Sequence, residues 1–310
     1  MEELKSNPIL YVLVGPSGSG KSTFAREYVR YHRGIINWVS SDNIRKELYG
    51  DESIQKDHAK VFDLMFKRTV ECLKKNESVI YDATNLSSKR RRHLIRQVRA
   101  KAECEIYCEL FVLPIEKLVE NDANRERSVG VDVIRRQIGQ FQVPSMDEGW
   151  DYIFWETEVL LDPVDFLCNK MDITHDNSHH QFDVKEHCVR VGEIIEALGK
   201  PVLAEAAFLH DCGKPFTKTF TNARGEVTEE AHYYGHQNWG AYYSLMMREL
   251  NPKSFLEVDW KKILERAFYI QYHMEPFFRQ GESWDKFVAM VGEEQAKNIL
   301  LLHEADIQNA

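Results

Sequence analysis

The sequence lacks long hydrophobic runs, paired cysteines and an excess of basic residues. No apolar segment approaches the ~18 residues that cross a bilayer, and Met1–Lys5 does not form a secretory signal. The six cysteines are scattered without metal-binding spacing, which indicates reduced thiols in a cytoplasmic protein. The formal net charge is −9, so any contact with nucleic acid must be local. We therefore expect a cytoplasmic protein with no membrane contact.

The 310 residues exceed one ordinary domain, and the two halves differ in pattern. Up to about residue 165, short apolar runs alternate with amphipathic helices, which predicts a parallel sheet with helices on both faces. Beyond the polar stretch Cys168–His180 the pattern is helical, with one interruption at Thr217–Thr228, and it holds most of the twelve histidines. We predict an α/β domain over residues 1–167 and an all-α domain over residues 168–310.

A glycine-rich motif separates the first predicted strand, Ile9–Val14, from the first predicted helix, Thr23–Tyr31. Its pattern is G-x-x-x-x-G-K-S, formed by Gly15, Pro16, Ser17, Gly18, Ser19, Gly20, Lys21 and Ser22. In such a loop the backbone N–H groups surround phosphates, the lysine adds positive charge and the serine hydroxyl binds Mg²⁺. These residues, together with Thr23, are predicted to bind ATP or another nucleoside triphosphate with Mg²⁺.

Polar residues follow the next predicted strands, at the sheet edge where ligands bind. Asp42 could accept the proton of an attacking hydroxyl and Arg45 could hold a phosphate, or Asp42 could only cap its helix. Asp82 could orient Mg²⁺ or only cap a turn. Arg125 and Arg127 could close over the phosphates or form a solvated charged surface.

The glycine-rich loop and three later segments resemble, in the same order, the kinase domain of phage-type polynucleotide kinases. The matching segments, within residues 8 to about 142, are Ser41–Arg45, Asp82–Leu86 and Asn124–Val129. The resemblance implies that Asp42 is the general base toward a 5′-hydroxyl and that Arg45 contacts phosphate. Arg125 or Arg127 would support the transferred phosphoryl group. Gly130 departs from the family pattern, in which a proline is usual at that position.

A predicted basic helix, Ser87–Ala102, could contact the substrate. Its residues Arg92, Arg96 and Arg99 fall on one helical face. Such a patch on an acidic protein would suit the end of a polynucleotide. The alternative is an ordinary solvated face.

The second half contains six side chains that could bind metal, namely His187, His210, Asp211, His236, His273 and Asp306. Imidazole and carboxylate groups suit Mn, Fe, Co, Ni or Zn. His210 and Asp211 are adjacent, so both can reach one metal site only if their helix ends there. Gly213, Lys214 and Pro215 predict such an ending. Any one of these histidines alone would more often be an ordinary helix residue.

Residues 174–310 resemble the HD superfamily of metal-dependent phosphohydrolases. His187, His210–Asp211 and Asp306 match the four ligands that define the superfamily. The segments Ala231–His236 and Tyr269–Met274 look like the HD domains of bacterial tRNA nucleotidyltransferases.

The resemblance implies one or two divalent transition metals. In two-metal members, histidines at the places of His236 and His273 hold the second ion, and Asp211 is available to bridge. Lys214 could bind phosphate, and His180 and His232 are lesser candidates for the site.

A 5′-end kinase joined to a phosphohydrolase suggests repair of nucleic-acid ends. The sequence therefore predicts a bifunctional RNA or DNA end-healing enzyme, an ATP-dependent 5′-hydroxyl kinase and a phosphohydrolase of 2′,3′-cyclic phosphate or 3′-phosphate ends. A ligase that joins the healed ends would be a partner. One alternative is a small-molecule or nucleoside kinase fused to a nucleotide phosphohydrolase. Another is a nucleotide-binding regulatory protein whose HD domain senses metal.

Overall fold

The computed structural model describes residues 7–157, 160–177, 181–250 and 258–309. The chain divides into two compact units, the first formed by Met1–Gln137 and Pro144–Thr157 and the second by Ile138–Val143 and Glu158–Ala310. The boundary predicted near residue 167 lies within helix α7 (Pro163–Asn169), which belongs to the second unit. The chain therefore passes from one unit to the other three times.

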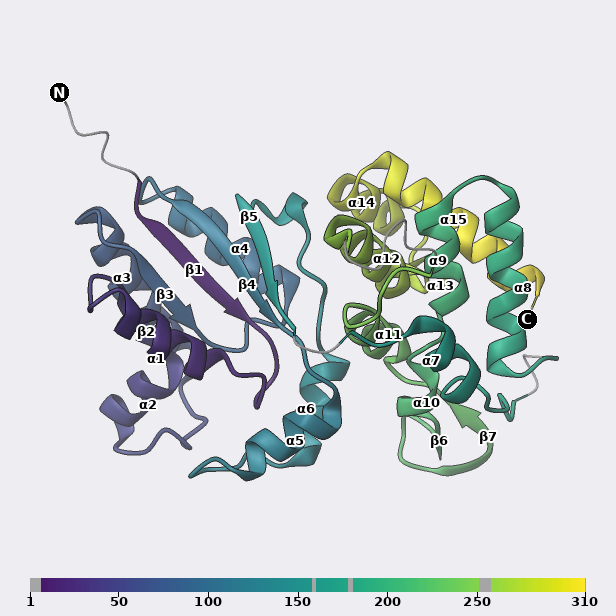
Figure 1. Ribbon diagram of the computed structural model, residues 1–310, viewed down its shortest axis with the longest axis horizontal. Helices are drawn as coiled ribbons and strands as arrows, with labels where there is room; N and C mark the ends of the chain where they lie inside the picture. Colours follow the sequence, from purple (N-terminus) through teal and green to yellow (C-terminus); the bar gives the residue numbers. More distant parts are fainter. Residues whose placement is uncertain (1–6, 158–159, 178–180, 251–257, 310) are drawn as a thin grey trace. The chain divides into compact units, whose positions relative to one another are not determined.

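The first unit is built on a five-stranded parallel sheet in the order β2-β3-β1-β4-β5, with helices on both faces (Figure 1). The strands are β1 (Ile9–Val14), β2 (Asn37–Ser40), β3 (Val79–Asp82), β4 (Glu105–Phe111) and β5 (Tyr152–Glu156). Strand β1 lies centrally and is buried along nearly its whole length, as expected for a continuous apolar run between two parallel neighbours. The predicted parallel sheet is confirmed.

Strand β5 was not predicted as a strand. It follows an irregular acidic segment and is only five residues long, so its pattern is weak. Its aromatic side chains pack on β4, where the ring of Tyr107 lies 5.0 Å from that of Tyr152 and 5.6 Å from that of Phe154, centroid to centroid. These cross-strand aromatic contacts hold the edge strand in register.

Among the described residues, six α-helices and one short 3₁₀ helix accompany the sheet, and the last two residues of the sixth, α6, already belong to the second unit. They are α1 (Lys21–Tyr31), α2 (Ser41–Tyr49), α3 (His58–Lys74), α4 (Ser88–Arg99), α5 (Ile115–Ala123), α6 (Val131–Gly139) and η1 (Met146–Glu148). Phe24 and Tyr28 of α1 pack against the buried sheet residues Tyr11, Leu13 and Phe111. This packing fixes the start of α1 beside the end of β1, where the glycine-rich loop lies.

The second unit is mainly helical. Its helices are α7 (Pro163–Asn169), α8 (Val184–Ala197), α9 (Pro201–Leu209), α10 (Lys214–Thr217), α11 (His236–Ser244), α12 (Trp260–Tyr272), α13 (Glu275–Phe278), α14 (Glu282–Val291) and α15 (Glu293–Gln308). Within the described ranges of the whole chain, no helix is both long and apolar enough to cross a membrane.

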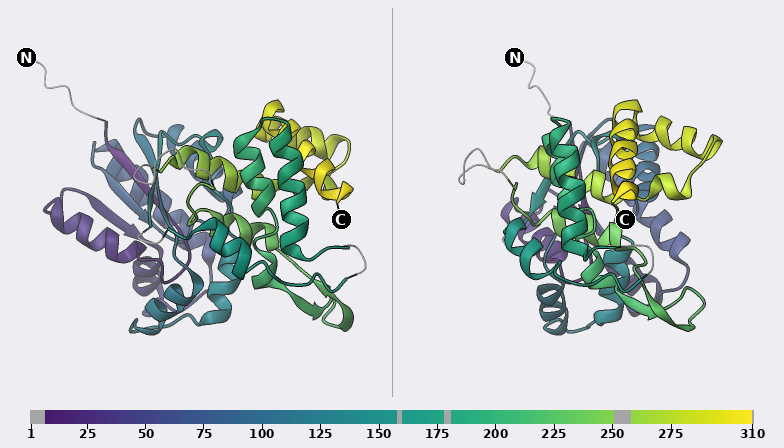
Figure 2. Two further views of the ribbon diagram at one scale, coloured as in Figure 1. Left: turned by 45° about the vertical axis from the view of Figure 1, so that its right-hand side comes forward. Right: turned by 90° about the vertical axis from the view of Figure 1, so that its right-hand side faces the viewer.

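One part of the second unit departs from the all-α prediction. Strands β6 (Thr219–Thr221) and β7 (Val227–His232) form an antiparallel pair that extends from the helices of its unit (Figure 2). The connecting turn places Gly225 at φ +84°, a conformation that glycine adopts readily. The interruption predicted at Thr217–Thr228 therefore corresponds to a hairpin.

Candidate active sites

The glycine-rich loop is shaped by a close approach of neighbouring backbone. Gly18 has φ +80°, and a Cβ atom at this position would lie 2.3 Å from the carbonyl oxygen of Leu118. A Cβ atom at Gly15 would lie 2.5 Å from the carbonyl oxygen of Phe111. Any side chain at either position would collide with backbone, so the loop geometry requires both glycines.

Lys21 is buried at the base of this loop. Its Nζ donates to the carbonyl oxygen of Pro16 at 2.6 Å and to Ser19 Oγ at 3.3 Å. Burial lowers the pKa of Lys21 to about 8, although the charge of Asp82 acts in the opposite direction. The ammonium group is therefore held by the loop itself, at a place where the phosphates of a nucleotide would stabilise its charged form.

Ser22 and Asp82 are brought together as a magnesium site requires. Ser22 Oγ donates to Asp82 Oδ2 at 3.0 Å, and Trp38 Nε1 donates to the same oxygen at 3.1 Å. Burial raises the pKa of Asp82, while the charge of Lys21 and the two hydrogen bonds oppose this shift. The adjacent hydroxyl and carboxylate oxygens are the hard ligands that Mg²⁺ prefers.

The structure separates the two roles considered for Asp42. Ser40 is the N-cap of α2, where its side chain accepts hydrogen bonds from the backbone N–H groups of Asp42 and Asn43. Asp42 instead pairs with Arg45, with 3.1 Å between Oδ1 and Nη1. The helix therefore does not need the Asp42 carboxylate as its cap.

Arg45 carries an unused donor. Its side chain is only 6% exposed, whereas that of Asp42 is 42% exposed. The buried Nε atom of Arg45 has no hydrogen-bond partner among the described residues. A buried guanidinium with an open donor beside an accessible carboxylate suits recognition of a phosphate next to a hydroxyl group.

Arg125 and Arg127 belong to the segment that was predicted to close over the phosphates, which we call the lid. These two lid arginines have different surroundings. Arg125 Nη1 lies 3.5 Å from Asp122 Oδ1, and the positive charge of Arg125 contributes to lowering the pKa of Lys21. Arg127 Nη1 instead lies 4.0 Å from Glu52 Oε1. Asp122 also accepts hydrogen bonds from the Val129 and Gly130 N–H groups, which fixes the intervening turn. Arg125 is thus the arginine whose charge reaches the phosphate-binding loop.

Gln137 and Asn121, which were not predicted from the sequence, form hydrogen bonds with the glycine-rich loop although they lie far from it in the chain. The Gln137 side chain accepts from the Ser17 N–H at 2.7 Å and donates to Ser17 Oγ at 3.1 Å. Asn121 Nδ2 donates to the Gly18 carbonyl oxygen at 2.9 Å. Both residues lie more than a hundred positions from their partners, and no local pattern marks them.

The basic helix, here α4, differs from the predicted patch. Arg91 is buried and forms a bidentate pair with Glu148, at 2.8 Å from Nε to Oε2 and 2.6 Å from Nη2 to Oε1. Arg92 pairs with Asp147, and Arg99 Nη2 pairs with Asp151 at 2.8 Å. Of the three arginines predicted to share one face, Arg92 and Arg99 therefore form ion pairs within the protein. An acidic segment distant in sequence neutralises them.

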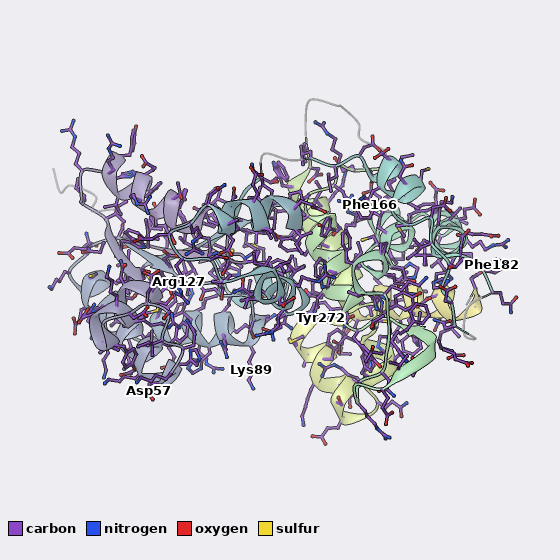
Figure 3. All side chains as sticks on the ribbon, turned by 90° about the horizontal axis from the view of Figure 1, so that it is seen from below. Asp57, Lys89, Arg127, Phe166, Phe182 and Tyr272 are labelled. Carbon is purple, nitrogen blue, oxygen red and sulfur yellow. The ribbon has the colours of Figure 1, made fainter. Side chains whose placement is uncertain are left out.

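Exposed cations nevertheless remain at the start and middle of α4. They are Lys89, Arg90 and Arg96, and Lys89 is labelled in Figure 3 together with Arg127 of the lid. Arg96 Nη2 also contacts the His93 ring at 3.4 Å. Any contact of α4 with nucleic acid would have to use these side chains.

In the second unit, the six predicted metal-binding side chains converge in the interior. They are His187 of α8, His210 after α9, Asp211, His236 at the start of α11, His273 after α12 and Asp306 of α15. Helix α9 ends at Leu209, so His210 and Asp211 leave the regular helix and both reach the same interior. We call this group the histidine cluster.

The histidines of the cluster share one arrangement, in which Nδ1 lies against a backbone carbonyl oxygen. The distances are 2.9 Å for His187 to Asn309, 2.7 Å for His210 to Ala207, 2.8 Å for His236 to Tyr233 and 2.7 Å for His273 to Ile270. Donation from Nδ1 to a carbonyl directs the Nε2 lone pair inward, as in metal-ligating histidines.

The inward nitrogen atoms face one another. Nε2 of His187 lies 3.1 Å from Nε2 of His210, and Nε2 of His236 lies 3.3 Å from Nε2 of His273. Two lone pairs at such distances repel unless a proton or a metal cation lies between them. The cluster is therefore suited to a cation.

The carboxylates divide the cluster into two halves. One half contains His187, His210 and Asp306, and the other contains Asp211, His236 and His273, with the ligand atoms of each half within 4.8 Å of one another. Asp306 Oδ1 lies 3.0 Å from His187 Nε2. Asp211 presents Oδ2 to His210 at 3.5 Å and Oδ1 to His236 at 3.3 Å. The two oxygen atoms of Asp211 thus face different halves, as a bridging ligand would.

A third possible group, with Cys188, suits a metal less well. The potential ligand atoms of Cys188, His210 and Asp211 also lie within 4.8 Å of one another. Its Sγ, however, lies 3.7 Å from His210 Nδ1, the nitrogen that also contacts the Ala207 carbonyl oxygen. The thiol therefore faces the side of the imidazole that points away from the other ligands.

The electrostatics differ among the histidines of the cluster. Burial alone would lower the pKa of His210, but Cys188 and Asp211 outweigh it and hold that pKa well above its usual range, so His210 would lose a proton on binding a metal. Burial, followed by the charges of neighbouring histidines, lowers the pKa of His273 to about 3, and burial also lowers the pKa of His236. Burial alone would raise the pKa of Asp211, but Lys214 and His210 outweigh it and hold that pKa well below its usual range. Neutral imidazoles and an ionised carboxylate are the forms that bind metals.

Lys214 and a residue not predicted, His175, adjoin Asp211. Lys214 Nζ lies 2.6 Å from Asp211 Oδ2 and 3.0 Å from His175 Nε2. His175 Nδ1 contacts the Phe182 carbonyl oxygen at 2.8 Å, like the histidines of the cluster. His175 was missed because it lies in a polar segment without helical periodicity.

Of the two lesser candidates, His232 does not join the histidine cluster. His232 lies on β7, where its Nε2 is 3.0 Å from Thr228 Oγ1. His180 lies outside the described residues.

Comparison with known proteins agrees with the geometry of the first unit. Residues 10–144 match a family model described as an AAA domain. The first unit holds a P-loop kinase-like domain. This fold implies a nucleotide with Mg²⁺ as its ligand. No curated protein matches the chain.

Several solved structures are similar to part of the chain. A chain of the Pnkp1/Rnl/Hen1 RNA repair complex is 26% identical with a TM-score of 0.40, and the match covers 45% of each chain. A fungal RNA kinase is 19% identical with a TM-score of 0.37, over 48% of this chain and 38% of that one. A gluconokinase from Sinorhizobium meliloti 1021 is 18% identical with a TM-score of 0.35, over 48% and 82%.

The match thus spans less than half the length of the RNA repair chain. All three TM-scores lie below 0.5, so these likenesses assign no substrate to this chain.

Proposed function

We propose that the protein is a bifunctional end-healing enzyme that acts on RNA. Its first unit would transfer the γ-phosphate of ATP to a 5′-hydroxyl end, and its second unit would hydrolyse a 2′,3′-cyclic phosphate or a 3′-phosphate. The observation that carries this proposal is the presence, in one chain, of a phosphate-binding loop and a buried cluster of inward-facing imidazole nitrogens. A ligase that joins the healed ends would be the partner.

In the kinase reaction, Asp42 accepts the proton of the 5′-hydroxyl as its oxygen attacks the γ-phosphorus. The new O–P bond forms while the bond from the γ-phosphorus to the β,γ-bridging oxygen breaks, and ADP leaves. Lys21 and Arg125 offset the charge on the transferred group. Arg45 holds Asp42 in place and offers its open Nε to a phosphate. Ser22 and Asp82 would hold Mg²⁺, which neutralises the phosphate charge.

In the phosphohydrolase reaction, His187, His210 and Asp306 would hold one ion, and Asp211, His236 and His273 would hold a second. One or two divalent ions of Mn, Fe, Co, Ni or Zn at these ligands would supply Lewis acidity toward phosphate and a water of lowered pKa. Lys214 offers its ammonium group to a phosphate oxygen. His175 accepts a hydrogen bond from Lys214 and keeps that group beside Asp211.

The proposal is tested with the purified full chain and RNA substrates of defined ends. A 5′-hydroxyl RNA with ATP and Mg²⁺ should gain a 5′-phosphate, and a 2′,3′-cyclic-phosphate RNA should lose its cyclic phosphate with at least one of Mn²⁺, Co²⁺, Ni²⁺ or Zn²⁺. Asp42→Asn should abolish the first reaction. Asp57→Asn, the same change at an exposed position of the same unit, should not. Intact RNA ends in all wild-type reactions would refute the proposal.

One observation favours the alternative of a small-molecule or nucleoside kinase fused to a nucleotide phosphohydrolase. Ion pairs with Asp147 and Asp151 neutralise Arg92 and Arg99, which reduces the basic surface available to a polynucleotide. This alternative predicts that a free nucleoside is phosphorylated as efficiently as a 5′-hydroxyl oligonucleotide. A preference for the oligonucleotide in kcat/KM would exclude it.

A further inference from the structure

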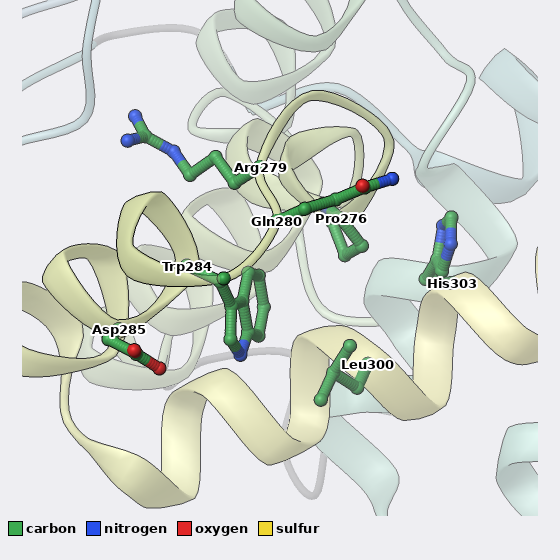
Figure 4. Close-up of a pocket in the computed structure, with 8 residues that line it drawn as sticks. Pro276, Arg279, Gln280, Trp284, Asp285, Leu300 and His303 are labelled. Carbon is green, nitrogen blue, oxygen red and sulfur yellow. The ribbon is translucent and has the colours of Figure 1, made fainter.

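A pocket of about 360 Å³ opens on the second unit (Figure 4). Its lining includes Pro276, Arg279, Trp284, Asp285, Leu300 and His303. These residues come from α13, the turn after it, α14 and α15. The volume lies within the range of ordinary small-molecule sites.

Two residues that line the pocket are close in the chain to ligands of the histidine cluster. Pro276 follows His273 by three residues, and His303 precedes Asp306 by three residues on α15. Residues three apart on a helix are neighbours on its surface. The rings of Phe277 and His303 pack edge to face with their centroids 4.3 Å apart, which joins α13 to α15 at the pocket wall. Helix α15 therefore both supplies the cluster ligand Asp306 and lines the pocket, and α13 begins two residues after the ligand His273.

The chemistry of the lining suits a flat, uncharged ring with polar edges. Trp284 offers a partly exposed indole and packs against Phe287 at 5.3 Å between ring centroids. The guanidinium of Arg279 lies 5.3 Å from the same Phe287 ring and pairs with Glu275. Aromatic and guanidinium planes are the groups on which nucleobases stack.

The same lining argues against a phosphate in the pocket itself. Asp285 is exposed at its edge and would repel an anion. The Arg279 charge is already paired with Glu275. Gln280 is an exposed neutral residue with both a donor and an acceptor, as recognition of a base edge requires.

We propose that this pocket binds the nucleoside whose phosphate lies at the histidine cluster, with the base stacked on Trp284. The inference rests on the proposed phosphohydrolase function and adds the recognition of its substrate. The nucleoside could belong to the 3′ end of an RNA or to a free nucleotide, since both present the same base and ribose.

The test measures binding in a Lys21→Ala background, so that the phosphate-binding loop does not contribute. The probes are adenosine 3′-monophosphate, a short RNA ending in a 3′-phosphate, and inorganic phosphate, each titrated with Mn²⁺ present. Trp284→Ala should weaken binding of the mononucleotide by about 5- to 150-fold, the range of a lost base–aromatic stack. Binding of inorganic phosphate should not change. Trp284→Phe should restore most of the affinity.

Trp260→Ala is the matched control, because Trp260 is also exposed but begins α12, whose other end precedes His273. Equal affinity of the Trp284→Ala protein and its Lys21→Ala parent for the mononucleotide would overturn the inference. Loss of affinity for inorganic phosphate in the folded Trp284→Ala variant would also overturn it. Tighter binding of the RNA than of the mononucleotide would identify an RNA end as the ligand, whereas equal binding would identify a free nucleotide.

Hydrolysis is measured separately from binding, so that the pocket and the phosphohydrolase function are tested independently. Trp284-dependent binding without hydrolysis of any phosphate end would support the pocket and refute the phosphohydrolase. Hydrolysis with an unchanged KM in Trp284→Ala would refute the pocket alone.

Discussion

Lys21 of the phosphate-binding loop and the residues of the histidine cluster are all buried and polar, but the two sites are prepared for ligands of opposite charge. In the loop, the Lys21 ammonium already donates to the Pro16 carbonyl and to Ser19. In the histidine cluster, the Nε2 atoms of His187 and His210 face each other at 3.1 Å, and those of His236 and His273 do so at 3.3 Å. The loop provides hydrogen-bond acceptors for its own ammonium group. The histidine cluster instead brings several nitrogen lone pairs close together.

This difference determines how strongly each unit depends on its ligand. A phosphate that enters the loop exchanges one set of hydrogen bonds for another. A cation that enters the cluster removes a repulsion that the protein alone can relieve only by protonation. We therefore expect the second unit to gain more stability from its metal than the first unit gains from its nucleotide.

The largest effects should come from the central residue of each site. Asp211→Ala removes the carboxylate that faces both halves of the cluster and should reduce hydrolysis by more than about 10³-fold, with the kinase rate unchanged. Lys21→Ala should give the reverse pattern. Single-turnover assays of both reactions on both variants measure this. Loss of both activities in either folded variant would show that the sites are not independent.

The lid arginines allow a paired test within the first unit. Arg125→Gln should lower kcat for phosphoryl transfer by about 10²- to 10³-fold, because its charge reaches the loop. Arg127→Gln should change kcat by less than about 3-fold, since an exposed pair such as that with Glu52 contributes little. The same steady-state assay with 5′-hydroxyl RNA compares them. The opposite order of effects would assign the catalytic role to Arg127.

Metal content should distinguish the two halves of the histidine cluster. We expect about two equivalents of a transition metal per wild-type chain, and His273→Ala should reduce this toward one and slow hydrolysis at least ~10-fold. His232→Ala, on the hairpin, should leave the metal content unchanged. Inductively coupled plasma mass spectrometry after dialysis gives the stoichiometry. A single equivalent in wild type, with an active His273→Ala variant, would indicate one ion held by His187, His210, Asp211 and Asp306.

Nucleotide affinity should depend on pH through Lys21. Burial places the pKa of this lysine at about 8 in the protein without nucleotide, and bound phosphates would raise it. The lysine is therefore almost fully charged only well below pH 8 and half charged near pH 8, and affinity should fall by up to ~10-fold per pH unit above pH 8 until the raised pKa of the complex is reached. Calorimetric titration with ATP at pH 7 and pH 9 tests this. A pH-independent dissociation constant would show that Lys21 stays charged.

The smallest effect should come from α4. Replacing Arg90 and Arg96 with Gln should reduce the salt dependence of RNA binding by roughly 1.4 to 1.8 in the log–log slope if both contact phosphates. The same change at Arg92 and Arg99 should alter the slope less, because Asp147 and Asp151 already neutralise them. Equal slopes for the two double variants would remove α4 from the RNA-binding surface.

Much of the fold could be predicted from the sequence because its signals are local. The glycine-rich loop, the strand before it and the helix after it lie within about twenty residues, and the parallel sheet follows from strand–helix alternation. The histidine and aspartate residues of the cluster could also be singled out by residue type and by the predicted helix end after Asp211. Their division into ligands of one or two ions came from a family resemblance, since they are spread over more than a hundred residues.

The remaining features depend on long-range pairing, which no local pattern records. Arg91 belongs to the predicted basic helix Ser87–Ala102, yet it is buried against Glu148, 57 residues away. Gln137 reaches the phosphate-binding loop across 120 positions. His175 joins Lys214 from a segment without helical periodicity. In each case one partner is an ordinary polar residue whose role arises only when the chain is folded.

The short segment Ile138–Val143 has a consequence for dissecting the protein. It lies in the sequence of the kinase half but folds with the helical unit, where the Gln271 side chain binds the Val143 N–H at 2.7 Å and the Phe141 carbonyl at 3.1 Å. A fragment cut after Thr157 would carry the buried side chains of Ile138 and Phe141 without their partners. During synthesis the same segment leaves the ribosome long before Gln271 does. The two units are therefore interleaved in the sequence, and neither can be expressed as one uninterrupted piece.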